Sequence, residues 1–286
     1  MGVRTPVVDA HHHFWTPSRY DYYWMADASL DPIRRPFTPE DLQPELDTVG
    51  VDATVLVQTV PSLAETREFM AIAAATPFVA GVVGWVDLID PEVGATLADL
   101  QSQPHGKTLV GIRHQVHDEG DAAWLLRPDV QRGLAAVRDA GLAYDILVRP
   151  RELPAALAMA RAFPEMRLVI DHLAKPPIAS GEIDAWAALM EPFRKLAHVS
   201  CKLSGMITEA DWGRWTADDL APYVARIVDI FGVERVMYGS DWPVCLLAGS
   251  YGAVKRALED ALPPLSGEER AQVFGGNAIR FYRLPE

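Results

Sequence analysis

The sequence predicts an α/β fold, a (β/α)₈ TIM barrel forming a single domain over residues 1–286. Short apolar runs rich in β-branched residues alternate along the chain with segments whose apolar residues recur at helical spacing. Near-continuous apolar strands that alternate with helices are typical of a parallel sheet covered on both faces, and a count of eight favours closure into a barrel. The expected strands are Val7–His13, Ala53–Thr59, Val79–Leu88, Leu109–Val116, Ala143–Val148, Arg167–Leu173, His198–Leu203 and Arg235–Gly239.

The segments between these runs carry helix boundary signals. Pro91 and Pro128 suit first helical turns, and Gly141 and Gly232 stand where a glycine ends a helix. An open, doubly wound sheet is the alternative, since one miscounted strand removes the argument for closure. No glycine-rich fingerprint follows the first strand, which disfavours a dinucleotide site. The expected helices are Leu63–Ala75, Pro91–Gln101, Pro128–Ala140, Arg151–Phe163, Ile183–Leu196, Thr216–Phe231 and Leu265–Tyr282.

The composition is that of a globular chain with an acidic surface. Apolar residues make up 49% and charged residues 23%, and 26 basic against 39 acidic side chains give a net charge of −13. Without a basic patch, such a surface repels nucleic acids and anionic membranes, so we expect only a small-molecule partner. The two cysteines cannot form a disulfide framework, and the sequence shows neither a leader peptide nor a membrane span. We therefore expect a cytoplasmic protein, and the sequence does not predict its oligomeric state.

Polar side chains gather at the carboxyl ends of three predicted strands, where barrel active sites lie. Alternation along the first strand puts His11 and His13 on one face, a half-site for a divalent metal, although two hydrogen-bonded core histidines would look the same. His172 follows the sixth strand, and Asp241 follows the eighth, beside the first in a closed barrel. A carboxylate there can ligate a metal or carry a proton, although Asp241 also suits a turn before Pro243.

Five motifs spread over nearly the whole chain give a resemblance to a known family. They are VDAHHHFW at the start, GIRH at Gly111–His114, IDHLAKP at Ile170–Pro176, KLSG at Lys202–Gly205 and YGSDWP at Tyr238–Pro243. The chain resembles the amidohydrolase superfamily, and within it the metal-dependent hydrolase branch of lactonases and pyrone dicarboxylate hydrolases. The resemblance implies hydrolysis of the ester bond of a small sugar lactone, with Asp241 as the catalytic carboxylate.

The resemblance also implies a ligand set and helper residues. A single divalent metal, zinc, is expected on His11, His13 and Asp241, although members of this branch differ in whether they need one. The fifth strand offers no histidine and the fourth no evident bridging lysine, so a two-metal centre is not expected. We expect water held by Asp241 and the metal to attack the lactone carbonyl, with His172 or Arg113 stabilising the oxyanion.

Substrate contacts are expected from aromatic and polar side chains near strand ends. Aromatic faces suit the C–H faces of a sugar ring. Arg113 and Arg149 are the only arginines placed at catalytic-side strand ends, which favours a neutral polyhydroxy lactone over a dicarboxylate. The expected contacts are Trp15, Trp24, Trp242, His114, Asp145 and Lys202, with His117 and Arg149 as further polar candidates.

Two other functions fit parts of this pattern. The same scaffold supports a decarboxylase or hydrolase of an aromatic or pyrone carboxylate, which a glutamate in the first strand would favour, but that strand reads Asp-Ala-His-His-His. A barrel that binds a sugar acid without catalysis is the other, and it is disfavoured because buried histidines and a carboxylate are costly when unused. Turnover of a lactone separates both from the lactonase hypothesis.

Overall fold

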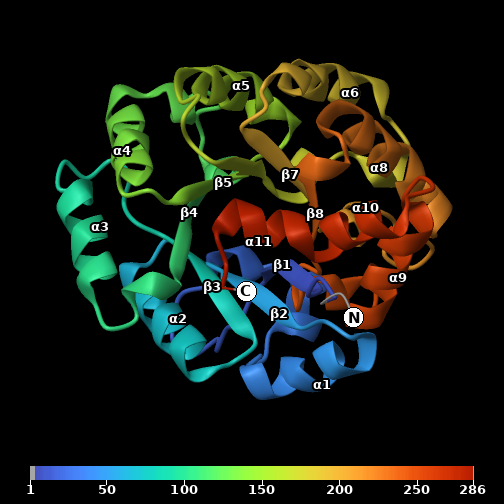
Figure 1. Ribbon diagram of the computed structural model, residues 1–286, viewed down its shortest axis with the longest axis horizontal. Helices are drawn as coiled ribbons and strands as arrows, with labels where there is room; N and C mark the ends of the chain where they lie inside the picture. The colour runs from blue at the N-terminus through green and yellow to red at the C-terminus, as the bar shows by residue number, and fades with distance from the viewer. Residues whose placement is uncertain (1–3, 286) are drawn as a thin grey trace.

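A computed structural model describes residues 4–285, and within them eight parallel strands follow one another around a barrel in chain order. Each strand pairs with the next in sequence, as the alternating pattern predicted. The helices form a ring outside the strands (Figure 1). The strands are β1 (Val8–His12), β2 (Ala53–Val57), β3 (Val79–Gly84), β4 (Leu109–Gln115), β5 (Ala143–Leu147), β6 (Leu168–Ile170), β7 (Val199–Leu203) and β8 (Val236–Tyr238).

The barrel closes between β1 and the segment that follows β8. Asp241 donates its backbone N–H to the His11 carbonyl at 2.8 Å, and His13 donates to the Trp242 carbonyl at 2.7 Å. These two bonds continue the parallel ladder beyond the end of β8, so the predicted neighbours His11 and Asp241 are held side by side. The barrel prediction is confirmed, and the open-sheet alternative is set aside.

The helices agree with the sequence prediction except near prolines and glycines. The predicted final helix Leu265–Tyr282 is interrupted by a wider turn over Gln272–Gly276, and the predicted Ile183–Leu196 helix gives way to a 3₁₀ turn at Glu191, just before Pro192. Helices α1, α7 and α9 were not predicted; α1 contains Pro44, α7 follows Gly205 and α9 contains Gly252. The helices are α1 (Pro39–Val49), α2 (Leu63–Ala75), α3 (Val93–Ser102), α4 (Pro128–Asp139), α5 (Leu153–Ala162), α6 (Asp184–Met190), α7 (Met206–Glu209), α8 (Ala217–Phe231), α9 (Tyr251–Ala261), α10 (Gly267–Ala271) and α11 (Asn277–Tyr282).

The amino-terminal end of the barrel is sealed by apolar packing. Val8, Val169 and Met237 are among the strand side chains that form one buried cluster with Tyr282 and Leu284. Helix α11 lies across this end of the strands (Figure 1). Because apolar side chains fill this end, the interior opens only toward the carboxyl ends of the strands.

A register shift in β1 turns His11 toward the barrel interior and His12 away from it. Val8 and Ala10 pack in the interior cluster, so simple alternation would put His12 there as well. The pairing of β1 with β2 shifts between Asp9 and His12, and His12 instead contacts the Thr54 hydroxyl at 2.8 Å. An irregularity of this kind re-aims side chains next to a site. As predicted, His11 and His13 share a face opposite His12.

A long ordered excursion, Trp15–Glu40, follows β1 at the carboxyl end of the barrel. It contains two 3₁₀ turns, Tyr23–Met25 and Ala28–Ile33, before α1 begins. The Trp15 indole donates to the Ile33 carbonyl at 3.1 Å, which ties the start of the excursion to its second turn. Within the described residues, no helix is long and apolar enough to cross a membrane.

Candidate active site

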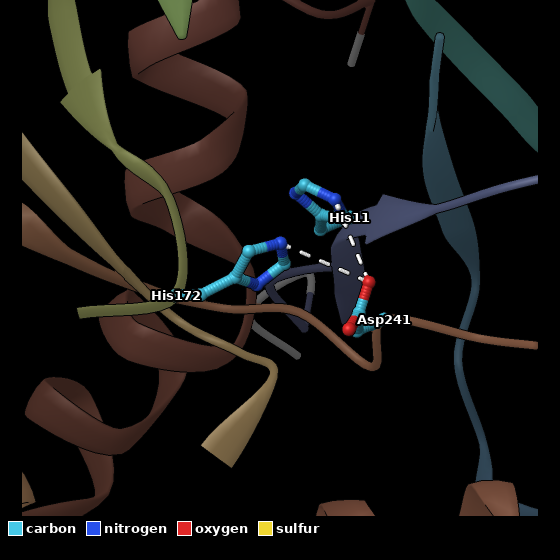
Figure 2. Close-up of side chains that lie close together, drawn as sticks. All are labelled: His11, His172 and Asp241. Carbon is cyan, nitrogen blue, oxygen red and sulfur yellow. Dashed lines mark ion pairs between the residues drawn. The ribbon is translucent and has the colours of Figure 1, made fainter. Parts of the chain in front are cut away.

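Three histidines and one aspartate converge at the open end of the barrel. Asp241 Oδ1 lies 3.4 Å from His13 Nε2 and 3.8 Å from the Nε2 atoms of both His11 and His172. Figure 2 shows that Asp241 faces both His11 of β1 and His172 of the segment after β6. All four side chains are at least 94% buried. The structure therefore brings together the strand-end residues that the sequence predicted would meet.

Hydrogen bonds from the surroundings fix how two of these imidazoles are presented. His13 Nδ1 lies 2.7 Å from the Val57 carbonyl, which can only accept, so His13 carries its proton there and leaves the Nε2 lone pair facing Asp241. His172 Nδ1 contacts the Ser204 hydroxyl at 2.9 Å, and its Nε2 also points to Asp241. Such bonds to the far nitrogen orient an imidazole for metal binding or proton transfer.

Burial and neighbouring groups give the histidines and the aspartate of the site different ionisation states. Burial lowers the pKa of His172 to about 3 and lowers the pKa of His13, so both imidazoles are neutral at pH 7. Burial opposes ionisation of Asp241, but the attraction of its carboxylate for the protonated forms of His172 and His13 and for the Lys175 ammonium outweighs burial and holds the carboxyl pKa below its ordinary value. The site therefore holds one carboxylate that can accept a proton, and the imidazoles around it are neutral.

The segment after β6 has an unusual backbone. His172, Leu173, Ala174 and Lys175 have φ values of 52°, 54°, 58° and 51°, and Asp241 has 58°. The left-handed region costs a non-glycine residue about 1–2 kcal/mol, and such strain gathers at functional sites. Gly205 contributes to this geometry, because a Cβ there would lie 2.6 Å from His172 Nδ1.

A layer of buried charges lies beneath His11. Lys202 Nζ contacts Asp145 Oδ2 at 2.6 Å, Asp171 Oδ1 at 3.1 Å and His11 Nδ1 at 3.1 Å. Arg113 Nη1 contacts Asp171 Oδ2 at 3.1 Å and His11 Nε2 at 3.2 Å. Two cations and two carboxylates balance, so this layer supports His11 without leaving an unpaired buried charge.

The donor set fits a single divalent metal ion. His11, His172 and Asp241 each offer one ligand atom, and these atoms lie within 4.8 Å of one another. Neutral imidazole and carboxylate are the protonation states that bind zinc. The predicted set had His13 in place of His172, and His13 Nε2 is also near Asp241. However, the Arg113 guanidinium, which is always a donor, already faces His11 Nε2.

A cavity of about 490 Å³ opens above this group. His13, Arg113, His172 and Asp241 form part of its lining, as does Trp24, which the sequence analysis gave as a substrate contact. His117 and Arg149, which the sequence analysis gave as polar candidates, also line it. The remaining wall combines apolar side chains with hydrogen-bonding groups, namely Tyr23, Leu30, Thr59, Gln115, Asp118, Leu147, Lys175, Thr208, Glu209, Trp212, Val244 and Leu247.

Comparison with known proteins agrees with this architecture. A family model described as amidohydrolase matches residues 8–284. The chain belongs to the amidohydrolase family. An L-fucono-1,5-lactonase of Burkholderia ambifaria is 44% identical over 97% of this chain and 95% of its own length. An L-fucono-1,5-lactonase of Burkholderia multivorans is 38% identical over 98% and 96%. A crystal structure of an amidohydrolase from Burkholderia multivorans with bound Zn covers 98% of this chain and 100% of its own, with 36% identity and a TM-score of 0.89.

Two residues of this amidohydrolase lie deeper than the sequence analysis expected. Asp145 and Lys202 were predicted to contact substrate hydroxyls, but both are fully buried in the charged layer below His11. The correction has a geometric cause. Alternation shows that a side chain points into the barrel, whereas its depth along the barrel axis depends on strand tilt and register.

Three other predicted contacts lie beside the cavity of this amidohydrolase and do not line it. Trp15 is 3% exposed and packs among aromatic rings of the excursion. Trp242 is 2% exposed and packs edge-on against Phe37. His114 stacks on Trp124 with ring centres 4.2 Å apart. These residues support the wall, which corrects the prediction of direct contact.

The sequence analysis also missed parts of the cavity of this amidohydrolase. Lys175 and Glu209 form an ion pair of 2.7 Å on its wall, and the Tyr23 hydroxyl donates to Asp118 at 2.9 Å. A signal for Lys175 was present, since it belongs to the quoted IDHLAKP motif. Glu209 ends the short helix α7 and Asp118 ends a 3₁₀ turn, and both elements are too short for the periodicity of the sequence to indicate them.

Proposed function

We propose that this amidohydrolase opens a small sugar lactone to its aldonic acid, with L-fucono-1,5-lactone as the first candidate. The observation that carries the proposal is the Asp241 carboxylate within 3.8 Å of three buried imidazoles on the floor of a polar cavity. Support for the lactone comes from relatives of 44% and 38% identity that are L-fucono-1,5-lactonases. The fold alone does not determine which reaction a protein catalyses. Relatives that align over nearly their whole length support lactone hydrolysis as the reaction.

The proposed reaction follows from the charges of the site. Asp241 accepts a proton from a water molecule while that water's oxygen bonds to the lactone carbonyl carbon. The negative charge that develops on the carbonyl oxygen is stabilised by hydrogen bonds from Arg113, with His172 adjacent. The ring C–O bond then breaks, and Asp241 returns its proton to the departing ring oxygen. The product is an acid that ionises at neutral pH and releases a proton.

We propose zinc as the metal that the site would hold, on His11, His172 and Asp241 with His13 adjacent. Support comes from the donor set and from the zinc in a structure of a 36% identical amidohydrolase. When bound, zinc would supply Lewis acidity toward an oxygen ligand. Arg113 beside His11 Nε2 is a second source of positive charge at the same place, which supports activity without metal.

The charge of the cavity wall favours a neutral substrate. Its cations are Arg113, Arg149 and Lys175, and its carboxylates are Asp118, Glu209 and Asp241. A dicarboxylate would be best held by several unopposed guanidinium groups. A balanced wall suits hydroxyl groups, which donate and accept. We therefore propose a polyhydroxy lactone over a pyrone dicarboxylate. We also propose the cytoplasm as its location, to which two buried cysteines without a disulfide lend support.

The experiment that tests this proposal is proton release, followed with a pH indicator, against a panel of aldonolactones. The panel holds L-fucono-, L-rhamnono-, L-galactono- and D-arabinonolactone, each with added zinc and with a chelator. We expect turnover of L-fucono-1,5-lactone and of lactones with related stereochemistry. Zinc dependence would support a metal role, and equal rates with chelator would assign the positive charge to Arg113. Folded protein that turns over none of them contradicts the proposal.

A further inference from the structure

We propose that the Lys175–Glu209 ion pair determines substrate specificity by binding two neighbouring hydroxyl groups of the lactone ring. This inference rests on the proposed lactonase function and adds a recognition element to it. It follows from where the two side chains lie, which polar atoms they leave available and what backbone holds them.

The pair stands on the cavity wall close to the reacting group. Lys175 Nζ and Glu209 Oε1 are 2.7 Å apart, and both residues line the 490 Å³ cavity. Lys175 closes the left-handed turn that begins at His172, and its backbone N–H donates to the His172 carbonyl at 2.7 Å. In a 3₁₀ turn, residues three apart lie on the same side. Lys175 is therefore on the His172 side of the turn, next to the group that would face the lactone carbonyl.

The ion pair leaves N–H donors of Lys175 and one carboxylate oxygen of Glu209 available to a ligand. An ammonium has three N–H donors, and among the described residues the Lys175 ammonium donates to Glu209 alone. Glu209 accepts this bond through Oε1, which leaves Oε2 open. A sugar hydroxyl both accepts and donates, so one hydroxyl can accept from Lys175 while its neighbour donates to Glu209. Hydrogen bonds to charged partners are the stronger kind, and a ring without hydroxyls would make none of them.

The backbone at Lys175 indicates a role for its side chain. Its φ of 51° lies in the region that favours glycine, so a lysine there is disfavoured unless its side chain offsets the strain. Surface ion pairs contribute little to stability on their own. The Lys255–Glu259 pair gives a contrast, since it has a similar separation of 2.8 Å and similar exposure, but it lies along helix α9, away from the cavity.

The test compares a hydroxylated lactone with one that has no hydroxyls. We would measure kcat/KM for L-fucono-1,5-lactone and for δ-valerolactone, and take their ratio as the discrimination of each enzyme. The variants are Lys175→Met, Glu209→Gln and the double variant, with Lys255→Met as the matched control. Because the ratio cancels general losses in rate or folded fraction, it reports on hydroxyl recognition specifically.

We expect the ratio to fall about tenfold or more in each single variant, as for a lost substrate hydrogen bond. The ratio of the double variant should be only a little lower than that of either single variant, because the two side chains act as one unit. Lys255→Met should keep the wild-type ratio within about twofold. An unchanged ratio in Lys175→Met and Glu209→Gln, or an equal loss on both lactones, overturns the inference while leaving the lactonase proposal standing. A wild-type enzyme inactive on both lactones overturns the lactonase proposal itself and this inference with it.

Discussion

The two ends of the barrel are built from the same eight strands but have opposite chemistry. At the carboxyl end, His13, His172 and Asp241 face an open cavity, on backbone that is in part strained. At the amino end, Tyr282 and Leu284 pack against strand side chains in a closed apolar cluster. Reactivity therefore resides in residues just beyond the carboxyl ends of the strands, whereas the opposite end of the barrel supplies stability.

A buried polar layer separates these two ends. The Tyr282 hydroxyl donates to Asp145 at 2.7 Å, and Asp145 pairs with Lys202, which contacts His11. If the ends are independent, changes below this layer alter stability alone and changes above it alter kinetics.

The Asp241→Asn substitution should have the largest effect on catalysis. An amide cannot accept the proton of the attacking water, so kcat should fall about a thousandfold or more. The fold should be intact, because the backbone N–H that closes the barrel on His11 is unchanged. Steady-state kinetics with urea unfolding would measure both. An active Asp241→Asn enzyme would remove this carboxylate from the mechanism.

Glu65 should make the active-site end sensitive to pH. Burial raises its carboxyl pKa from 4.5 to about 7, although the Thr59 and Val60 N–H groups and the Thr59 hydroxyl bond to it. Since the folded state binds this proton more tightly, its contribution is full below pH 4.5 and is lost as the pH rises to 7, a change of about 3 kcal/mol. In urea titrations, Glu65→Gln should gain stability over the wild type across that window. A constant difference between the two would contradict the assignment.

The Gly205→Ala substitution should misplace His172. The added Cβ would meet His172 Nδ1 at 2.6 Å, so the imidazole must move, and kcat should fall about tenfold to a hundredfold. Gly141→Ala is the matched control, because Gly141 also has a positive φ, of 71°, but has nothing within 4 Å of the added atom. The control should lose about 1 kcal/mol of stability and keep its kcat. Equal kinetics in both variants would show that His172 tolerates displacement.

The Tyr282→Phe substitution should affect stability by a small amount. It removes the hydrogen bond to the Asp145 carboxylate at the closed end, which should lower the free energy of unfolding by about 1–2 kcal/mol and leave kcat/KM unchanged. Tyr23→Phe removes a similar bond to Asp118 on the cavity wall and should change KM with little effect on stability. A lower kcat in Tyr282→Phe at unchanged stability would show that the polar layer couples the two ends.

The sequence predicted the barrel and the convergence of His11, His13, His172 and Asp241, because parallel strands place their carboxyl ends at one edge. The sequence could not indicate how far along the barrel axis a side chain lies. Asp145 and Lys202 point into the barrel as predicted, but they lie one layer below the cavity. The sequence also did not indicate the left-handed turn that places Lys175 on the same side as His172. Non-glycine residues enter that region only when tertiary contacts impose it, and local pattern carries no such information.

The most direct test of the account is a single turnover of L-fucono-1,5-lactone in ¹⁸O-enriched water with enzyme in excess. Attack of water on the carbonyl, with Asp241 as the base, predicts an aldonic acid that carries one ¹⁸O in its carboxylate from the first turnover. Mass spectrometry of the product and of the peptide containing Asp241 would read the label. Unlabelled acid with ¹⁸O on Asp241 would make this residue a nucleophile, and ¹⁸O at the former ring-oxygen position would place the attack away from the carbonyl; either result would contradict the account.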